Sequence, residues 1–186
     1  MDFDYKHIIV YAPTYRDYDG AYDNTNVLGY SDSEELESFL ASNDILLIVK
    51  YHPLQKLENI IFTKHVLNYE KSYDFTLYDL LSLSNMLVSD YSSVVHDYIV
   101  TGKPIVINSF DFEKYDLTRG FAFDPVEYIC PSPLCSTLKD LQNFILKELH
   151  SEIRSDKYYE IQKMFHKYID GNSTSRVWDF LKKYIS

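Results

Sequence analysis

Short apolar runs that alternate with helical patterns constrain the fold of this 186-residue chain more than any other feature. Residues 45–49 (Ile-Leu-Leu-Ile-Val) form a continuous apolar run, which is typical of a strand buried on both faces of a parallel sheet. Another strand is predicted at residues 7–11, and Pro13 ends it. Shorter strands are predicted at residues 66–67, 86–88 and 105–107.

Helical patterns fall between and after these strands. Ser31 and Asp32 precede Glu34 and Glu35 at capping-box spacing, which predicts a helix start after a polar loop that begins near Arg16. Because strands and helices alternate, the pattern predicts an α/β fold with an open, doubly wound, Rossmann-like parallel sheet. The other predicted helices are residues 76–84, residues 92–101 up to Gly102, and C-terminal helices from about residue 137, including 158–169 and 173–185.

The composition excludes several classes of partner. A net charge of −10 argues against nucleic-acid binding through phosphates and against a polybasic membrane patch. Cys130 and Cys135 form no metal-ligand pattern, so we expect reduced thiols in a cytosolic protein, with no metal and no cofactor. Residues 1–4 do not resemble a signal peptide, and no apolar run is as long as a membrane span.

Polar segments follow four of the predicted strands. Open α/β sheets bind ligands at the carboxyl ends of their strands, so these segments should share one edge of the sheet. The chain contains neither G-x-G-x-x-G nor G-x-x-x-x-G-K-[ST], which excludes the usual dinucleotide and P-loop solutions. The four segments are residues 12–16, 50–53, 90–93 and 108–111.

Ser92 and Ser93 lie between a buried strand and the start of a helix. A helix N-terminus offers free N–H groups and a positive dipole end, and the hydroxyls add donors, so this segment could bind a phosphate. The alternative is that the serines only cap the helix. Asp90 is expected to orient the turn instead of contacting an anionic ligand.

His52 lies directly after the predicted strand 45–49, within Lys-Tyr-His-Pro. Pro53 moves His52 away from helical geometry, so its ring should face the sheet edge, where it could bind a pyrophosphate or assist a leaving phosphate. The alternative is a solvated loop histidine. His96 is ambiguous, and the other histidines are interpreted as structural or surface residues.

Arg16 and Arg119 could each bind a phosphate bidentately. Either could equally pair with one of the many nearby carboxylates. Residues 170–173 (Asp-Gly-Asn-Ser) are interpreted as a turn and a helix N-cap.

Seven motifs, taken in order, resemble the C-terminal half of the CDP-glycerol glycerophosphotransferase family, which makes poly(glycerol phosphate) of the teichoic-acid kind. They extend over nearly the whole chain. Two positions depart from the family pattern, His96 and residues 131–133 (Pro-Ser-Pro). The motifs are residues 11–17 (Tyr-Ala-Pro-Thr-Tyr-Arg-Asp), 50–53, 77–81 (Leu-Tyr-Asp-Leu-Leu), 90–94 (Asp-Tyr-Ser-Ser-Val), 103–105 (Lys-Pro-Ile), 119–124 (Arg-Gly-Phe-Ala-Phe-Asp) and 170–173.

The resemblance implies that residues 1–186 are one CDP-glycerol-binding domain, the C-terminal half of a GT-B glycosyltransferase-like enzyme. An acceptor hydroxyl would attack the β-phosphate and CMP would leave. The N-terminal acceptor domain, with the general base, is absent, so the chain alone should be inactive. By resemblance, His52 is a catalytic or donor-binding residue, and the substrate-binding residues are Thr14, Arg16, Ser92, Ser93 and Arg119.

The implied partners are CDP-glycerol and, through the missing half, a glycerol-phosphate acceptor and the membrane. The implied location is the cytoplasm, with the inner face of the cell membrane as a peripheral site for the full-length protein. Two alternatives remain open. The chain could be a non-catalytic nucleotide-binding module, or belong to a related transferase that uses CDP-ribitol or a nucleotide sugar.

Overall fold

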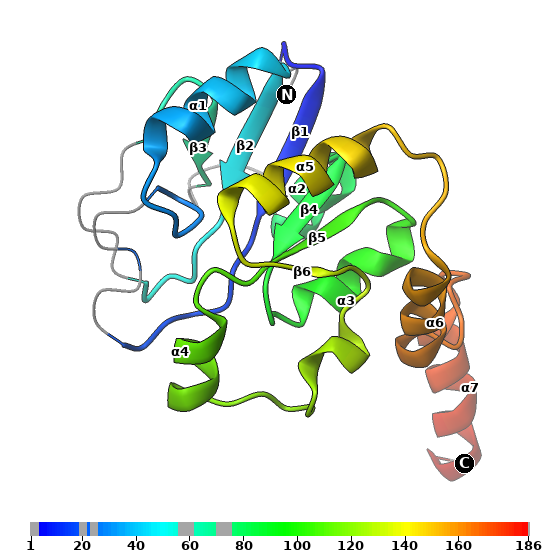
Figure 1. The fold of residues 1–186 in the computed structure, drawn as a ribbon. Helices are drawn as coiled ribbons and strands as arrows, with labels where there is room; N and C mark the ends of the chain where they lie inside the picture. The colour runs from blue at the N-terminus through cyan, green and yellow to red at the C-terminus, as the bar shows by residue number, and fades with distance from the viewer. Residues whose placement is uncertain (1–3, 19–21, 23–25, 56–61, 70–75, 186) are drawn as a thin grey trace.

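A computed structural model describes residues 4–18, 22, 26–55, 62–69 and 76–185. Its centre is a six-stranded parallel sheet in the order β3-β2-β1-β4-β5-β6 (Figure 1). Parts of the predicted polar loop after Arg16, and the extreme N-terminus, lie outside the described residues. The strands are β1 (His7–Tyr11), β2 (Ile45–Val49), β3 (Val66–Asn68), β4 (Met86–Ser89), β5 (Ile105–Asn108) and β6 (Leu134–Cys135).

Helices cover both faces of this sheet, as Figure 1 shows. Side chains of α1 and α5 pack with one face, whereas α2, α3 and α6 pack with the other. The fold is therefore the doubly wound α/β sheet that the alternating pattern predicts. The helices are α1 (Ser33–Ser42), α2 (Leu77–Leu83), α3 (Val94–Tyr98), α4 (Phe112–Thr118), α5 (Leu138–Leu149), α6 (Asp156–Phe165) and α7 (Ser173–Ile185), and 3₁₀ turns lie at Ile99–Thr101 and Val126–Ile129.

Alternate residues of the central strands supply the two halves of the core. Ile9 and Tyr11 of β1 point into the cluster that includes α1 and α5, and Val10 points into the opposite cluster. All five residues of β2 are buried, because both faces of this parallel strand are covered. Burial on both faces of the strand explains why residues 45–49 are a continuous apolar run.

Most predicted elements are confirmed, with differences that have local causes. The predicted helix 158–169 is wrong at both ends: α6 begins at Asp156, after the N-cap Ser155, and ends at Phe165. His166 leaves the helix, and its ring Nε2 lies 2.7 Å from the carbonyl of His96. Helix α4 and the two-residue strand β6 were not predicted.

The order of the strands fixes where a ligand should bind. The chain begins in β1, proceeds outward through β2 and β3, and then returns to β4 on the other side of β1. The connections therefore diverge between the carboxyl ends of β1 and β4, and such switch points hold ligands in open α/β sheets.

Helix α7 lies apart from the sheet at the end of the chain (Figure 1). None of its residues, Ser173 to Ile185, is buried in the structure. Among the described residues, no helix is both long and apolar enough to cross a membrane.

Candidate functional site

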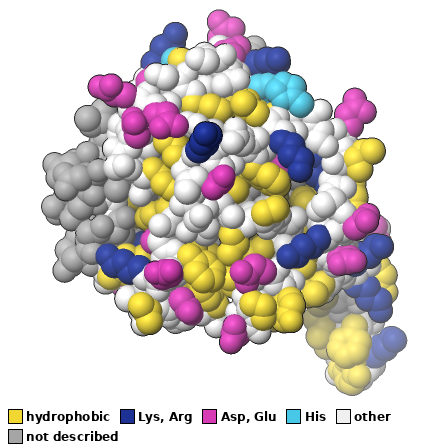
Figure 2. Space-filling model, in the orientation of Figure 1, with side chains coloured by type: hydrophobic (Ala, Val, Ile, Leu, Met, Phe, Trp, Pro, Cys, Tyr) yellow, Lys and Arg dark blue, Asp and Glu magenta, His cyan; other side chains and the backbone are white. Residues whose placement is uncertain are grey.

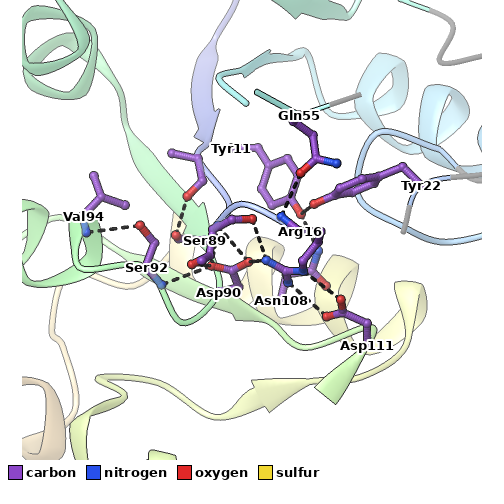
Figure 3. A network of polar contacts seen from close by, with 12 residues as sticks. Tyr11, Arg16, Tyr22, Gln55, Ser89, Asp90, Ser92, Val94, Asn108 and Asp111 are labelled. Atoms are coloured by element: carbon purple, nitrogen blue, oxygen red, sulfur yellow. Dashed lines mark hydrogen bonds and ion pairs between the residues drawn. The ribbon is translucent and has the colours of Figure 1, made fainter. Parts of the chain in front are cut away.

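The carboxyl ends of β1, β4 and β5 meet around the guanidinium of Arg16 (Figure 3). The side chain of Arg16 is 0% exposed. Its Nη1 lies 2.6 Å from Oδ2 of Asp90, and its Nε and Nη2 donate to the two oxygens of Asp111 at 2.8 and 3.0 Å. Asp111 is therefore held bidentately, the strongest geometry for an arginine–carboxylate pair. We call Arg16, Asp90 and Asp111 the edge cluster.

Charge within the edge cluster keeps its guanidinium protonated. Burial lowers the pKa of Arg16, but the charge of Asp90 and the hydrogen bond to Asp111 outweigh burial and raise that pKa above its ordinary value. Asp111 also accepts a hydrogen bond from the Tyr18 hydroxyl. Burial, followed by this bond, raises the pKa of Tyr18 as well. The guanidinium of Arg16 thus stays protonated, and it is paired with Asp90 and Asp111.

Asp90 connects the loop after β1 with the turn after β4. Its carboxylate accepts the backbone N–H of Thr14 at 2.9 Å and the Thr14 hydroxyl at 2.8 Å. It also accepts the backbone N–H of Ser92 at 3.1 Å. Asp90 therefore orients both segments from beneath, which is the role expected for it from the sequence.

The two serines differ in what their hydroxyls do. Ser93 occupies the N-cap position of α3 and is exposed, but its side chain makes no capping hydrogen bond to the described residues. Ser92 is half-buried, and its hydroxyl accepts the Val94 N–H at 3.4 Å, a long hydrogen bond. Capping therefore accounts for Ser92 in part and leaves the Ser93 hydroxyl available at the sheet edge.

His52 lies in an exposed turn directly after β2. Its Nδ1 accepts the Leu54 backbone N–H at 3.2 Å, so in the neutral ring the proton is on Nε2. The ring lies 5.1 Å from the ring of Tyr15, measured between centroids. The same turn contains Gln55, whose Oε1 accepts the Arg16 backbone N–H at 2.9 Å. The His52 turn is thus tied to the loop that contains Arg16.

Arg119 lies at the C-terminal end of α4 and is 36% exposed at its side chain. Its Nη1 donates to Asp17 at 3.0 Å, and Asp17 is itself exposed. Each of the two predicted arginines therefore pairs with a carboxylate, the alternative left open by the sequence. Only the pair of Arg119 is accessible to a ligand from solvent.

An aromatic cluster packs against the side chain of Arg16. The guanidinium carbon lies 4.8 Å from the ring centroid of Tyr115 and 5.9 Å from that of Tyr91. The Tyr91 ring also contacts Phe112 and Phe121. Burial raises the pKa of Tyr91, and its hydroxyl is buried with no hydrogen-bond partner among the described residues. These rings exclude water from one side of the edge cluster.

A cavity of about 650 Å³ opens beside Asp111, at the carboxyl ends of β5 and β6. This volume is within the range of small-molecule sites. Its lining mixes aromatic, hydroxyl and charged groups, which suits a polar ligand. The lining residues are Ser109, Phe110, Asp111, Phe112, Glu113, Lys114, Glu127, Leu134 and Ser136.

The structure brings most of the predicted site residues to one edge. Thr14, Arg16 and Ser92 are joined through Asp90, and His52 is joined to them through Gln55. Sequence reasoning missed the roles of Asp111, Gln55 and Tyr18. The position of Asp111 after a predicted strand was the available signal. Gln55 and Tyr18 had none, because their contacts are to residues far away in the chain.

No group of three or more His, Cys, Asp or Glu side chains that could hold a metal ion occurs in the described part of the chain. Burial raises the pKa of the Cys130 thiol to about 12 and that of Cys135 to about 11, so both are neutral thiols near pH 7. Neither cysteine is placed to act as a nucleophile.

Comparison with known proteins adds a family and a fold. Residues 3–183 match the family described as CDP-glycerol:poly(glycerophosphate) glycerophosphotransferase. The chain is 31% identical, over 182 residues, to the teichoic acid glycerol-phosphate primase of Bacillus subtilis (strain 168), covering 97% of this chain and 45% of that protein. It is 30% identical, over 175 residues, to the teichoic acid ribitol-phosphate polymerase TarL of Staphylococcus aureus (strain NCTC 8325 / PS 47), covering 92% of this chain and 30% of that protein.

The fold resembles that of the wall teichoic acid polymerase TagF, solved as a variant with CDPG. The TM-score is 0.64 at 24% identity, covering 98% of this chain and 43% of the TagF chain. The chain thus spans less than half the length of each of these relatives.

Proposed function

The chain belongs to the CDP-glycerol:poly(glycerophosphate) glycerophosphotransferase family, and on that premise we propose that residues 1–186 form the donor-binding domain of such a transferase. The observation that carries the proposal is the match of residues 3–183 to this family, together with the polar cluster at the strand switch point of this chain. The enzyme would act in the synthesis of teichoic acid or a related cell-surface polymer. It would belong in the cytoplasm, in contact with the membrane through its acceptor half.

The donor we propose is CDP-glycerol, with CDP-ribitol as the alternative. The family description names glycerol, and the TagF structure was obtained with CDPG. Because the chain is also similar to TarL, a ribitol-phosphate polymerase, CDP-ribitol remains the alternative donor. Both donors share the cytidine diphosphate, and this is the part that the sheet edge would hold.

In the proposed reaction, an acceptor hydroxyl attacks the β-phosphorus of the donor. A new P–O bond forms, the bond from the β-phosphorus to the bridging oxygen breaks, and CMP leaves. The hydroxyl proton passes to a general base, which we assign to a second, acceptor-binding domain of the enzyme. This chain would contribute donor binding and assistance to the leaving group.

We propose His52 as the residue that assists the departing phosphate. Its Nδ1 accepts a backbone N–H, so the neutral ring offers Nε2–H as a donor, and the protonated ring would offer charge as well. Its exposure allows direct contact with a ligand. The proposed donor contacts are Thr14, Ser92, Ser93 and Arg119, and the edge cluster around Arg16 lies beneath them.

A second candidate function is a non-catalytic nucleotide-binding module. The observation that favours it is that Arg16, Asp90 and Asp111 satisfy one another within the protein, so the sheet edge could bind a ligand without taking part in transfer. Such a module would bind the same CDP-containing ligand but would take no part in transfer.

Activity assays separate the two candidates. Residues 1–186 are incubated with CDP-glycerol and a glycerol-phosphate acceptor, alone and joined to the acceptor domain of a family member. We expect CMP release only from the joined protein, because a base must lie within hydrogen-bond reach of the attacking hydroxyl. CMP release by the chain alone would refute the divided active site, and an inactive joined protein that still binds donor would favour the module.

A further inference from the structure

We propose that Arg16 is a positioning residue, which fixes the loops that contact the donor without touching the donor itself. This inference rests on the proposed function, because it concerns the same sheet edge. It assigns Arg16 a role different from that of the exposed Arg119, although the sequence predicts phosphate binding for both arginines.

The guanidinium of Arg16 makes its contacts within the protein. Each of its three nitrogens has a partner: Nε and Nη2 donate to Asp111, and Nη1 donates to the Thr14 carbonyl at 2.6 Å and pairs with Asp90. The side chain is 0% exposed, and Tyr115 packs against it. A phosphate could reach Arg16 only by displacing a buried carboxylate.

The edge cluster joins segments that contain the proposed donor contacts. Asp90 holds the backbone N–H groups of Thr14 and Ser92, which are two of the proposed donor contacts. Asp111 joins the segment after β5, and Gln55 joins the turn that contains His52. Three loops therefore meet at one buried guanidinium, and the His52 turn is tied to the backbone N–H of the same residue, so loosening the guanidinium should misplace several donor contacts at once.

Direct contact and positioning predict opposite effects for Asp111→Asn. This substitution keeps the size of the side chain and removes a negative charge beside an anionic ligand. If Arg16 bound the diphosphate directly, release from Asp111 would strengthen CDP binding. If Arg16 acts by positioning, the loss of its bidentate partner loosens the loops and weakens CDP binding.

Asp17→Asn is the matched control, since it makes the same change in net charge and removes the carboxylate partner of the exposed Arg119. Calorimetric titration with CDP would compare the two variants with the wild type, after near-ultraviolet circular dichroism shows that each is folded. We expect Asp111→Asn to weaken CDP binding about tenfold, the usual size of one charge-assisted hydrogen bond. Asp17→Asn should not weaken it.

Amide hydrogen exchange tests the same proposal without a ligand. In Asp111→Asn the amides of Thr14 and Ser92 should exchange faster, although neither residue contacts Asp111 in the hydrogen bonds described. If Asp111→Asn does not fold, Tyr18→Phe replaces it, because it keeps the ring and removes the hydroxyl that donates to Asp111, the bidentate partner of the guanidinium. The same direction of change is expected for both readouts.

Tighter or unchanged CDP binding in a folded Asp111→Asn, or unchanged exchange at Thr14 and Ser92, would overturn the positioning role. Failure of the proposed function looks different: the wild-type chain itself would not bind CDP. In that case the exchange measurement still decides whether Arg16 positions the loops.

Discussion

The sheet edge and the C-terminal helix α7 use charged and apolar side chains in opposite ways. At the edge, Arg16 and Asp90 are buried charges that satisfy each other within the protein. On α7, large apolar side chains face solvent, among them Trp178 at 55% and Tyr184 at 72% exposure. Figure 2 shows hydrophobic and basic side chains gathered on this helix, at the lower right.

This difference indicates which region contributes most to the stability of the domain and to the proposed chemistry. A buried charge without its partner is expensive, so the intact edge cluster should contribute strongly to the stability of the domain. Apolar side chains that stay exposed, as on α7, contribute little to the folding of this chain. Substitutions should therefore have large effects at the edge and small effects on α7.

The largest effect is expected at the edge cluster itself. Arg16→Met leaves two buried carboxylates unpaired, and breaking a buried pair typically costs about 3–5 kcal/mol of folding free energy. Urea unfolding would measure the loss. The matched control is Arg154→Met, which leaves a single carboxylate, that of Glu148 at 15% side-chain exposure, without its ion-pair partner. Equal destabilisation by the two variants would show that the edge cluster is an ordinary ion pair.

A large effect on rate, with little effect on stability, is expected at His52. If His52 assists the leaving phosphate, His52→Ala should lower kcat by about 100- to 10,000-fold, the usual contribution of a general acid or base. Donor binding should change much less, because the contribution is made in the transition state. The kinetics need a two-domain enzyme that contains this donor domain. A variant with near-normal kcat would reduce His52 to a structural turn residue.

An intermediate effect is expected from the paired substitution Ser92→Ala and Ser93→Ala. These hydroxyls would contact phosphate in the bound donor and in the transition state alike, and the helix N–H groups remain after substitution. KM for the donor should therefore rise, by about tenfold, with a smaller drop in kcat. A fall in kcat as large as that of His52→Ala, with KM unchanged, would contradict this assignment.

The smallest effect is expected on α7. A chain that ends at Gly171 loses no residue that is buried in the described part of the structure, so its free energy of unfolding should change by less than about 0.5 kcal/mol. A chain that ends at Ser155 also loses Tyr158 and Ile161, which are buried against the sheet, and should be destabilised by several times that amount, about 2–5 kcal/mol or more. Equal stability of the two truncated chains would contradict the contrast between the regions.

The sequence allowed much of the sheet to be predicted, because burial on both faces leaves a legible pattern. Strands β1 and β2 occur at the predicted residues, since each is a compact apolar run. Helix α4 was missed because only Tyr115 is buried in it, so its sequence has no apolar stripe. Strand β6 has two residues, too few to show any periodicity.

The site could be predicted only in outline. The rule about strand ends placed Thr14, His52, Ser92 and Asp111 on one edge, and the structure brings these segments together. The partners could not be predicted, because Arg16 and Asp111 are 95 residues apart and the chain offers 28 acidic residues as alternatives. Arg16 is buried and Arg119 is exposed, and no local sequence pattern predicts this difference.

The most direct test of the account is the preference of the wild-type chain for CDP over CMP. The N-terminus of α3, His52 and the accessible Arg119 should together bind both phosphates of CDP. The net charge of −10 opposes the binding of any anion. Calorimetric titration of residues 1–186 should therefore give tighter binding for CDP and CDP-glycerol than for CMP, with modest affinity for each. Equal affinity for CMP and CDP would contradict the account, because the β-phosphate would then not be bound at this edge.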